Sequence, residues 1–163
     1  MRQRTGQRSW ERRTDGYGAS TEPQSNFGLK SETKMCNQCE KILNRIWPLL
    51  DADKRYRTPD RCKGKDFYIK EMTRQGLEIV PQNVSITREA FLSTLHFLIQ
   101  NEHYFSNQCE IRSSNSRKTA GPLCLTSRDN NSNVRCINYI LPILQGFQII
   151  GIDSGRPNKT WII

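Results

Sequence analysis

The chain has 163 residues and a net charge of +9, with a sequence pI of about 9.5. Only 35% of the residues are hydrophobic and the mean hydropathy is -0.73, so a good part of the chain is expected to lie outside a packed core. No stretch approaches the roughly 18 to 20 apolar residues that span a bilayer, which excludes a membrane-spanning helix. The basic excess favours an anionic partner, and nucleic acid is the commonest one.

Residues 1–31 are rich in Arg, Gln, Ser, Thr and Gly and contain few large apolar side chains. We predict that they form a disordered basic arm. Because this region has no apolar run, we predict no signal peptide, reduced cysteines and an intracellular protein, either cytoplasmic or nucleoid-associated. The arm either follows a phosphate backbone or is an idle solvated tail, and its arginines are Arg2, Arg4, Arg8, Arg12 and Arg13.

Residues 32–84 are expected to form a small helical or irregular segment. Apolar residues recur at helical spacing from Cys39 to Leu50, and Pro48 should kink or shorten that amphipathic helix. The helix either packs on the rest of the protein or makes the contact of a homodimer. A charged loop over residues 51–65, a strand or helical turn over 67–72 and an irregular stretch over 73–84 are expected to follow.

The following region has three predicted elements. Residues 85–105 place Phe91, Leu95 and Leu98 at i, i+4 and i+7, which predicts a long amphipathic helix. Residues 108–114 suit a short strand, and residues 116–128 suit a short second helix with Pro122 in its first turn. Three cysteines of the C-terminal half fall at apolar positions and should behave as small core residues: Cys109, Cys124 and Cys136.

Residues 131–163 are predicted to form a third helix followed by a β-hairpin. Competent N-cap residues stand at 131–133, and Gly146 suits a left-handed C-cap. The helix should bury a stripe of residues at helical spacing, namely Val134, Ile137, Leu141 and Leu144. The strands of the hairpin are rich in β-branched and aromatic residues, and its tip carries Arg156 and Lys159.

The predicted order from residue 85 onward is therefore helix, strand, helix, helix and β-hairpin. In this order residues 85–163 resemble the winged helix-turn-helix family of DNA-binding domains, through a pattern of elements and not through a residue motif. The resemblance implies an α+β fold with a C-terminal winged helix, preceded by the small helical segment and the basic arm. It also implies binding of double-stranded DNA, by a sequence-specific regulator or a target-recognition module.

The resemblance implies that the third helix lies in the major groove and that the wing and flanking loops hold phosphates. Asparagine can pair with adenine and arginine with guanine, so the open side of this helix is chemically able to read bases. A solvated helix face without a ligand is the alternative. The expected DNA-binding residues are Arg117, Lys118, Arg128, Asn131, Asn133, Arg135, Asn138, Tyr139, Arg156 and Lys159.

Two other kinds of site are weaker in the sequence. Cys36 and Cys39 have the CxxC spacing of a zinc site, but a set completed by Cys62 and His103 looks contrived, so we predict plain thiols and no metal or other cofactor. The order Asp15, Glu32, Lys34 matches a nuclease pattern by chance, and we assign no catalytic residues. One alternative function is a small endonuclease, or a fragment of a restriction or mobile-element nuclease, whose winged helix locates the target. The other is a winged helix used for protein contact.

Overall fold

The computed structural model describes residues 36–163. This part of the chain is mixed α+β, as predicted, and its strands form two antiparallel sheets. The arm expected over residues 1–31 and the candidates Asp15, Glu32 and Lys34 lie outside the described residues. The described residues belong to one compact unit, and their buried apolar side chains form a single core that extends from Cys39 to Ile162.

The first helix, α1 (Asn37–Ile46), is amphipathic as expected. Its buried residues Cys39, Leu43 and Ile46 recur at helical spacing, so one face packs against the core and the other meets solvent. Pro48 follows in a short 3₁₀ helix (Trp47–Leu49), where the α-helix ends. The Trp47 indole N–H donates to the Thr73 carbonyl oxygen at 2.8 Å and thereby fastens this end to a turn of the first sheet.

Beyond α1, the segment predicted to be small and helical or irregular contains a four-stranded sheet, of which only residues 67–72 were expected as a possible strand. Its strands pair in chain order: β1 (Tyr56–Arg57), β2 (Asp66–Met72), β3 (Gly76–Val80) and β4 (Val84–Thr87). The physical reason is a period of two in burial, since Phe67 and Ile69 are buried in β2 and Leu77 and Ile79 in β3. On the solvent side, Lys70 pairs with Glu78 across the two strands at 3.1 Å.

The order of elements expected after residue 85 is observed, but the first helix was predicted too long, because residues 85–87 belong to β4 and the helix ends at Gln100. The order comprises α2 (Arg88–Gln100), β5 (Cys109–Glu110), α3 (Pro122–Asp129), α4 (Ile137–Gly146), β6 (Ile150–Asp153) and β7 (Lys159–Ile162). The last three strands form a sheet in the order β5-β7-β6. Local signals fix two helix starts: the Thr87 hydroxyl accepts from the Ala90 N–H at 3.1 Å, and Pro122 stands in the first turn of α3.

The start of α4 was predicted too early. Ser132 and Asn133 have φ angles of 51° and 61°, which an α-helix does not allow, so residues 131–136 form a loop and the helix begins at Ile137. Val134, expected in the buried stripe, is 45% exposed. The left-handed residue after the helix is Gln148, with φ 57°, and not Gly146.

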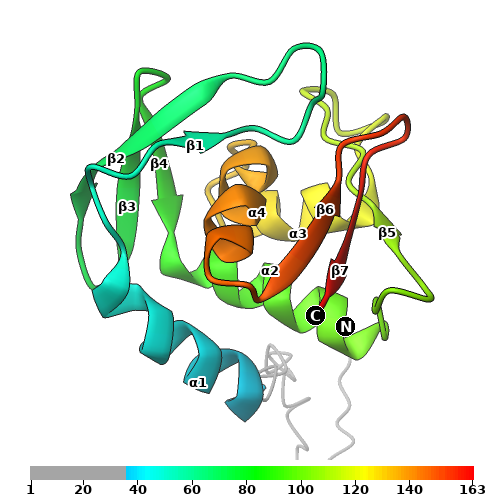
Figure 1. Cartoon of the computed structure of the whole chain (residues 1–163), viewed down its shortest axis with the longest axis horizontal. Helices are drawn as coiled ribbons and strands as arrows, with labels where there is room; N and C mark the ends of the chain where they lie inside the picture. Colours follow the sequence, from blue (N-terminus) through cyan, green and yellow to red (C-terminus); the bar gives the residue numbers. More distant parts are fainter. Residues whose placement is uncertain (1–35) are drawn as a thin grey trace, which may run out of the picture. The chain divides into compact units, whose positions relative to one another are not determined.

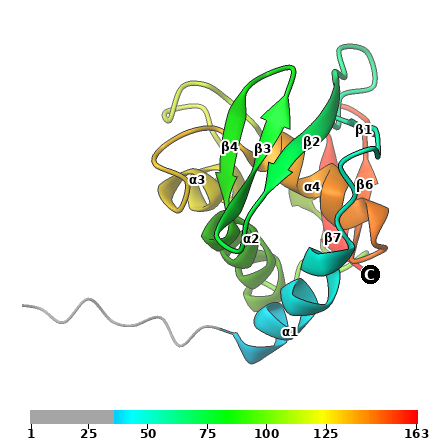
Figure 2. The ribbon, with the colours of Figure 1, turned by 90° about the vertical axis from the view of Figure 1, so that its left-hand side faces the viewer.

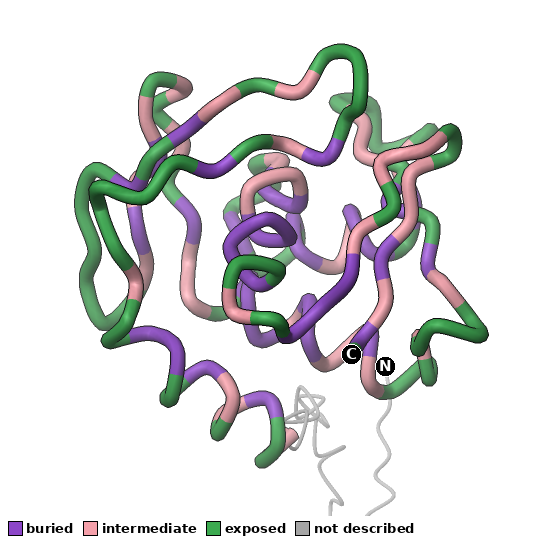
Figure 3. The backbone as a smooth tube through the Cα atoms, viewed as in Figure 1, coloured by how far each residue is buried: buried purple, intermediate pink, exposed green. Residues whose placement is uncertain are grey.

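Helix α4 is the central element of the described fold. Figure 1 shows it between the four-stranded sheet on one side and the β5-β7-β6 sheet on the other. Six of its ten residues are buried, and the tube coloured by burial is mostly purple along it (Figure 3). Cys109, Cys124 and Cys136 are buried, which confirms their prediction as core residues.

Candidate nucleic-acid interface

Asn131 does not lie on an open helix face. It is buried, its side-chain oxygen accepts from the Thr87 N–H at 2.8 Å, and its amide nitrogen donates to the Ser85 carbonyl at 3.1 Å. These bonds join the loop before α4 to strand β4, where Thr87 lies 44 residues and Ser85 lies 46 residues before Asn131 in the chain. The expectation that Asn131 is exposed for base contact is therefore wrong, because its buried side chain bonds the backbone of Ser85 and Thr87.

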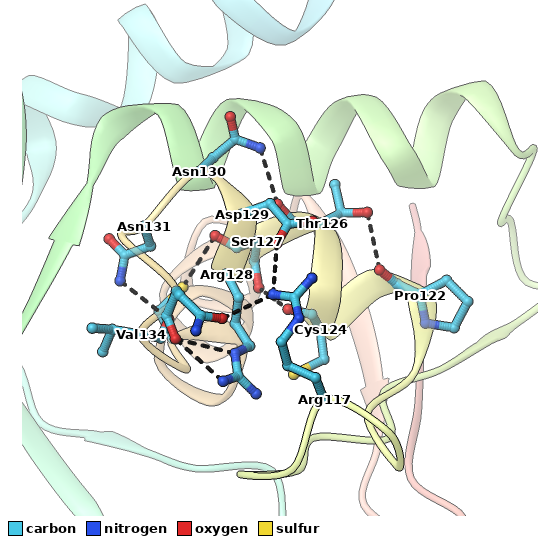
Figure 4. Close-up of polar contacts among 12 residues, drawn as sticks. Arg117, Pro122, Cys124, Thr126, Ser127, Arg128, Asp129, Asn130, Asn131 and Val134 are labelled. Atoms are coloured by element: carbon cyan, nitrogen blue, oxygen red, sulfur yellow. Dashed lines mark hydrogen bonds and ion pairs between the residues drawn. The ribbon is translucent and has the colours of Figure 1, made fainter.

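Arg128 also points inward, as Figure 4 shows at the end of α3. Its guanidinium donates to the carbonyl oxygens of Ser114 at 3.0 Å, Asn115 at 3.1 Å and Asn133 at 3.2 and 3.3 Å. Four donor contacts from the buried Arg128 to backbone carbonyls hold the β5–α3 loop against the loop that follows α3. The guanidinium is thus engaged inside the fold, where a phosphate cannot reach it.

Arg117 and Lys118 lie on the exposed β5–α3 loop. Arg117 pairs with Asp129 at 2.7 Å and also donates to the Asn133 side-chain oxygen at 2.8 Å (Figure 4). Both partners of the ion pair are about half exposed, so the pair contributes little to stability and can exchange for a phosphate. Lys118 forms no ion pair within residues 36–163.

The side of α4 expected to read bases is covered. Tyr139 is half-buried and meets the ring of Phe67 edge-on, with the centroids 5.1 Å apart, and burial raises the pKa of its hydroxyl. Asn138 is half-buried too, and its side-chain oxygen has no hydrogen-bond partner within residues 36–163. Arg135, half-buried just before the helix, is the remaining basic residue on that side.

The β6–β7 hairpin carries Arg156 on its exposed tip, as predicted, whereas Lys159 lies at the start of β7 and is half-buried. The tip is fixed by neighbours from distant parts of the chain. The Asn158 side-chain amide donates to the Pro59 carbonyl at 2.6 Å, and the Asn158 carbonyl accepts from the Ile111 N–H at 3.0 Å. The hairpin tip therefore joins the β1–β2 loop to the β5–α3 loop.

These three loops form what we call the basic end, defined as residues 58–65, 111–121 and 153–159. They lie at the upper end of the molecule in both Figure 1 and Figure 2. The basic end holds eight Lys and Arg against two acidic residues. All the basic side chains except Lys159 are exposed: Arg61, Lys63, Lys65, Arg112, Arg117, Lys118 and Arg156.

The two carboxylates of the basic end are used within their own loops. Asp60 accepts from the backbone N–H groups of Lys63 at 2.8 Å and Cys62 at 2.9 Å, and these bonds lower its pKa. Asp153 accepts from the Gly155 N–H at 2.9 Å. Within residues 36–163, Arg117 is the one basic residue of this end that forms an ion pair. The other cations are free to bind an external anion.

Sequence reasoning missed Arg61, Lys63 and Lys65 as site residues. Their clustering is visible in the sequence, but the contact that brings them to the hairpin tip joins Pro59 to Asn158, which are 99 residues apart. No local pattern predicts such a contact. Within residues 36–163, three or more potential metal ligands gather at Cys36, Cys39 and His96 only, so Cys62 and His103 do not join the CxxC pair.

Comparisons with protein-family models, with curated proteins and with solved structures found no match to this chain. Within residues 36–163, none of the helices has the length and apolar character needed to cross a membrane.

Proposed function

We propose that this protein binds double-stranded DNA through the basic end. The observation that carries the proposal is the meeting of three loops, distant in sequence, that hold eight basic and two acidic residues at one end of the fold. Duplex DNA carries one negative charge per roughly 1.7 Å of its axis and releases counterions when cations replace them. A cluster of exposed cations on loops that are hydrogen-bonded to one another is suited to that exchange.

Residues 88–162 are proposed to be a winged helix with a modified role for its third helix. The β6–β7 hairpin serves as the wing, with Arg156 at its tip, and the β5–α3 loop adds Arg112 and Lys118. Base reading needs an accessible helix in the major groove, whereas Tyr139 of α4 packs under β2. Binding is therefore expected to rest on phosphate contacts, with little discrimination between duplex sequences.

The proposal is tested by measuring the affinity for a fluorescent duplex of arbitrary sequence over a series of salt concentrations. If about five cations reach phosphates, the slope of log K against log salt is about -4.5, since each contact contributes roughly 0.9. A slope flatter than about -1 would contradict phosphate binding and favour the use of this domain for protein contact.

The same purified protein can be used to distinguish an endonuclease from a DNA-binding protein without nuclease activity. Incubation with supercoiled plasmid and magnesium distinguishes cleavage from binding, because a nuclease produces nicked or linear plasmid and a binding protein leaves it supercoiled. Residues 36–163 gather no group of three carboxylates, so we expect the plasmid to stay intact.

A further inference from the structure

Two cysteines and one histidine meet at the end of the fold that is opposite to the basic end. Cys36 and Cys39 stand at the start of α1, and His96 lies in α2, which packs beside α1 (Figure 2). The two Sγ atoms and an imidazole nitrogen all lie within 4.8 Å of one another. The CxxC spacing places both thiols on the same side of the first helical turn, and the α1–α2 packing brings the imidazole to them.

The donor set matches the chemistry of zinc. Zinc binds thiolate sulfur at about 2.3 Å and imidazole nitrogen at about 2.0 Å in a tetrahedron, so its ligand atoms lie about 3.5–3.8 Å apart. The observed spread needs to close by about 1 Å, which rotation of the half-buried Cys36 and His96 side chains can supply. Two soft sulfur ligands disfavour magnesium and calcium, which take oxygen ligands.

A cavity of about 460 Å³ opens beside the three ligands. Ser93 and Gln100 line it from α2, one turn before and one turn after His96, and Asn130 lines it from the residue after α3. Residues 1–35 contain neither cysteine nor histidine, and Cys62 and His103 lie outside the cluster. No fourth cysteine or histidine of residues 36–163 therefore joins this cluster.

We propose that Cys36, Cys39 and His96 bind one zinc ion whose fourth coordination position faces this cavity. Three protein ligands with one position left for water or an external ligand is the arrangement of an open zinc site. The ion would bridge α1 to α2 and make the attachment of α1 depend on metal. The site is independent of DNA binding, because it shares no residue with the basic end.

A redox-active cysteine pair is the competing interpretation. The pKa of Cys36 is lowered, mainly by a hydrogen bond from the backbone amide of Cys39. Burial raises the pKa of Cys39 to about 12. Redox-active cysteine pairs show such a difference between their two pKa values. A disulfide between the two cysteines would not involve His96. A metal ion would, because the imidazole nitrogen lies close enough to both sulfur atoms to be a third ligand. The histidine therefore decides between the two, and a disulfide becomes an outcome of the test.

The test uses the full chain purified under reducing conditions, with its zinc content measured by elemental analysis. We expect about one zinc per chain. We also expect Cys36→Ser and His96→Asn each to weaken zinc binding more than about 100-fold, which is more than the loss of a residue that only supports a ligand would cost. The matched controls Cys62→Ser and His103→Asn change the same residue types outside the cluster and should retain zinc. Circular dichroism identifies any variant that fails to fold.

Three results would overturn the proposal. One is folded protein that neither contains zinc nor takes it up when zinc is added, another is equal loss of zinc in the control variants, and the third is a Cys36–Cys39 disulfide as the stable state. The open position is tested with cobalt(II) in place of zinc, since added imidazole should change the absorption of an open site. An unchanged spectrum would show that the protein supplies all four ligands.

Discussion

Tyr139 of α4 meets the ring of Phe67 of β2 edge-on, with ring centroids 5.1 Å apart and an interplanar angle of 86°. Phe67 in turn stacks on Tyr56 of β1 at 5.4 Å. This aromatic row joins the N-terminal sheet to the central helix, so the two halves of the described chain share one core. It also places β2 over the side of α4 that a base-reading helix would need to expose.

Removal of the Phe67 ring should destabilise the whole described fold. Phe67 is fully buried, so Phe67→Ala is expected to lower the free energy of unfolding by about 3–5 kcal/mol. The neighbouring Tyr68 is exposed, and Tyr68→Ala should cost less than about 1 kcal/mol. Urea unfolding of both variants checks this, and a loss of less than about 1 kcal/mol for Phe67→Ala would contradict its place in a shared core.

Arg128→Ala should harm stability and not DNA binding. Its guanidinium donates to three backbone carbonyls that would lose their partners, so a loss of about 2–4 kcal/mol in the free energy of unfolding is expected. The exposed Lys118→Ala serves as the control and should leave stability within about 0.5 kcal/mol. A fall in the salt slope of DNA binding for folded Arg128→Ala would instead restore Arg128 as a phosphate contact.

Gly151 of β6 is required by the ring of Trp161 on the paired strand β7. A Cβ at Gly151 would overlap the Trp161 ring atoms Cε2 and Cζ2, so Gly151→Ala should cost about 1–3 kcal/mol. At Gly155 a Cβ meets the movable carboxylate of Asp153 at 3.1 Å, and Gly155→Ala should stay within about 0.5 kcal/mol. Thermal unfolding compares the two variants, and a neutral Gly151→Ala would mean that Trp161 is free to move.

Thiol reactivity should follow burial. Burial raises the pKa of Cys109 to about 11 and that of Cys136 to about 12, so both stay protonated and unreactive near neutral pH. Cys62 is exposed in the β1–β2 loop. Brief treatment of the native protein with iodoacetamide, followed by mass spectrometry, should modify Cys62 well before the other two, and denaturant should remove the difference. Equally rapid modification of Cys109 in the native protein would contradict its place in the core.

The sequence predicts those features of the fold that depend on local chemistry. Pro122 marks the start of α3, and the order of elements after residue 85 follows from helical spacing and turn residues. The start of α4 was misjudged because asparagine is both a good N-cap and a residue that tolerates positive φ, and Asn133 does the latter. Apolar residues alternate with polar ones in residues 66–80, which indicates strands. The strands are short and follow a charged loop, so this alternation was not recognised as a sheet.

The candidate sites depend on contacts between distant residues, and the sequence therefore revealed them only in part. Arg156 was expected at a hairpin tip, yet its proximity to Arg61 and Lys63 requires the bond between Asn158 and Pro59. His96 falls inside the helix predicted over residues 85–105, and nothing in the local sequence shows that the CxxC pair of α1 packs against it. Arg128 was expected to contact a phosphate and Asn131 to lie on a base-reading helix face, whereas burial gives both side chains structural roles.

The most direct measurement of binding by the basic end compares two doubly substituted proteins that lose the same charges. Arg61→Ala/Lys63→Ala removes one Arg and one Lys from the basic end, and Lys41→Ala/Arg45→Ala removes one of each from the exposed face of α1. With duplex DNA, the slope of log K against log salt should become shallower by about two units for the first protein and stay unchanged for the second. Equal slopes for the two proteins, with both folded, would contradict a DNA-binding surface at the basic end.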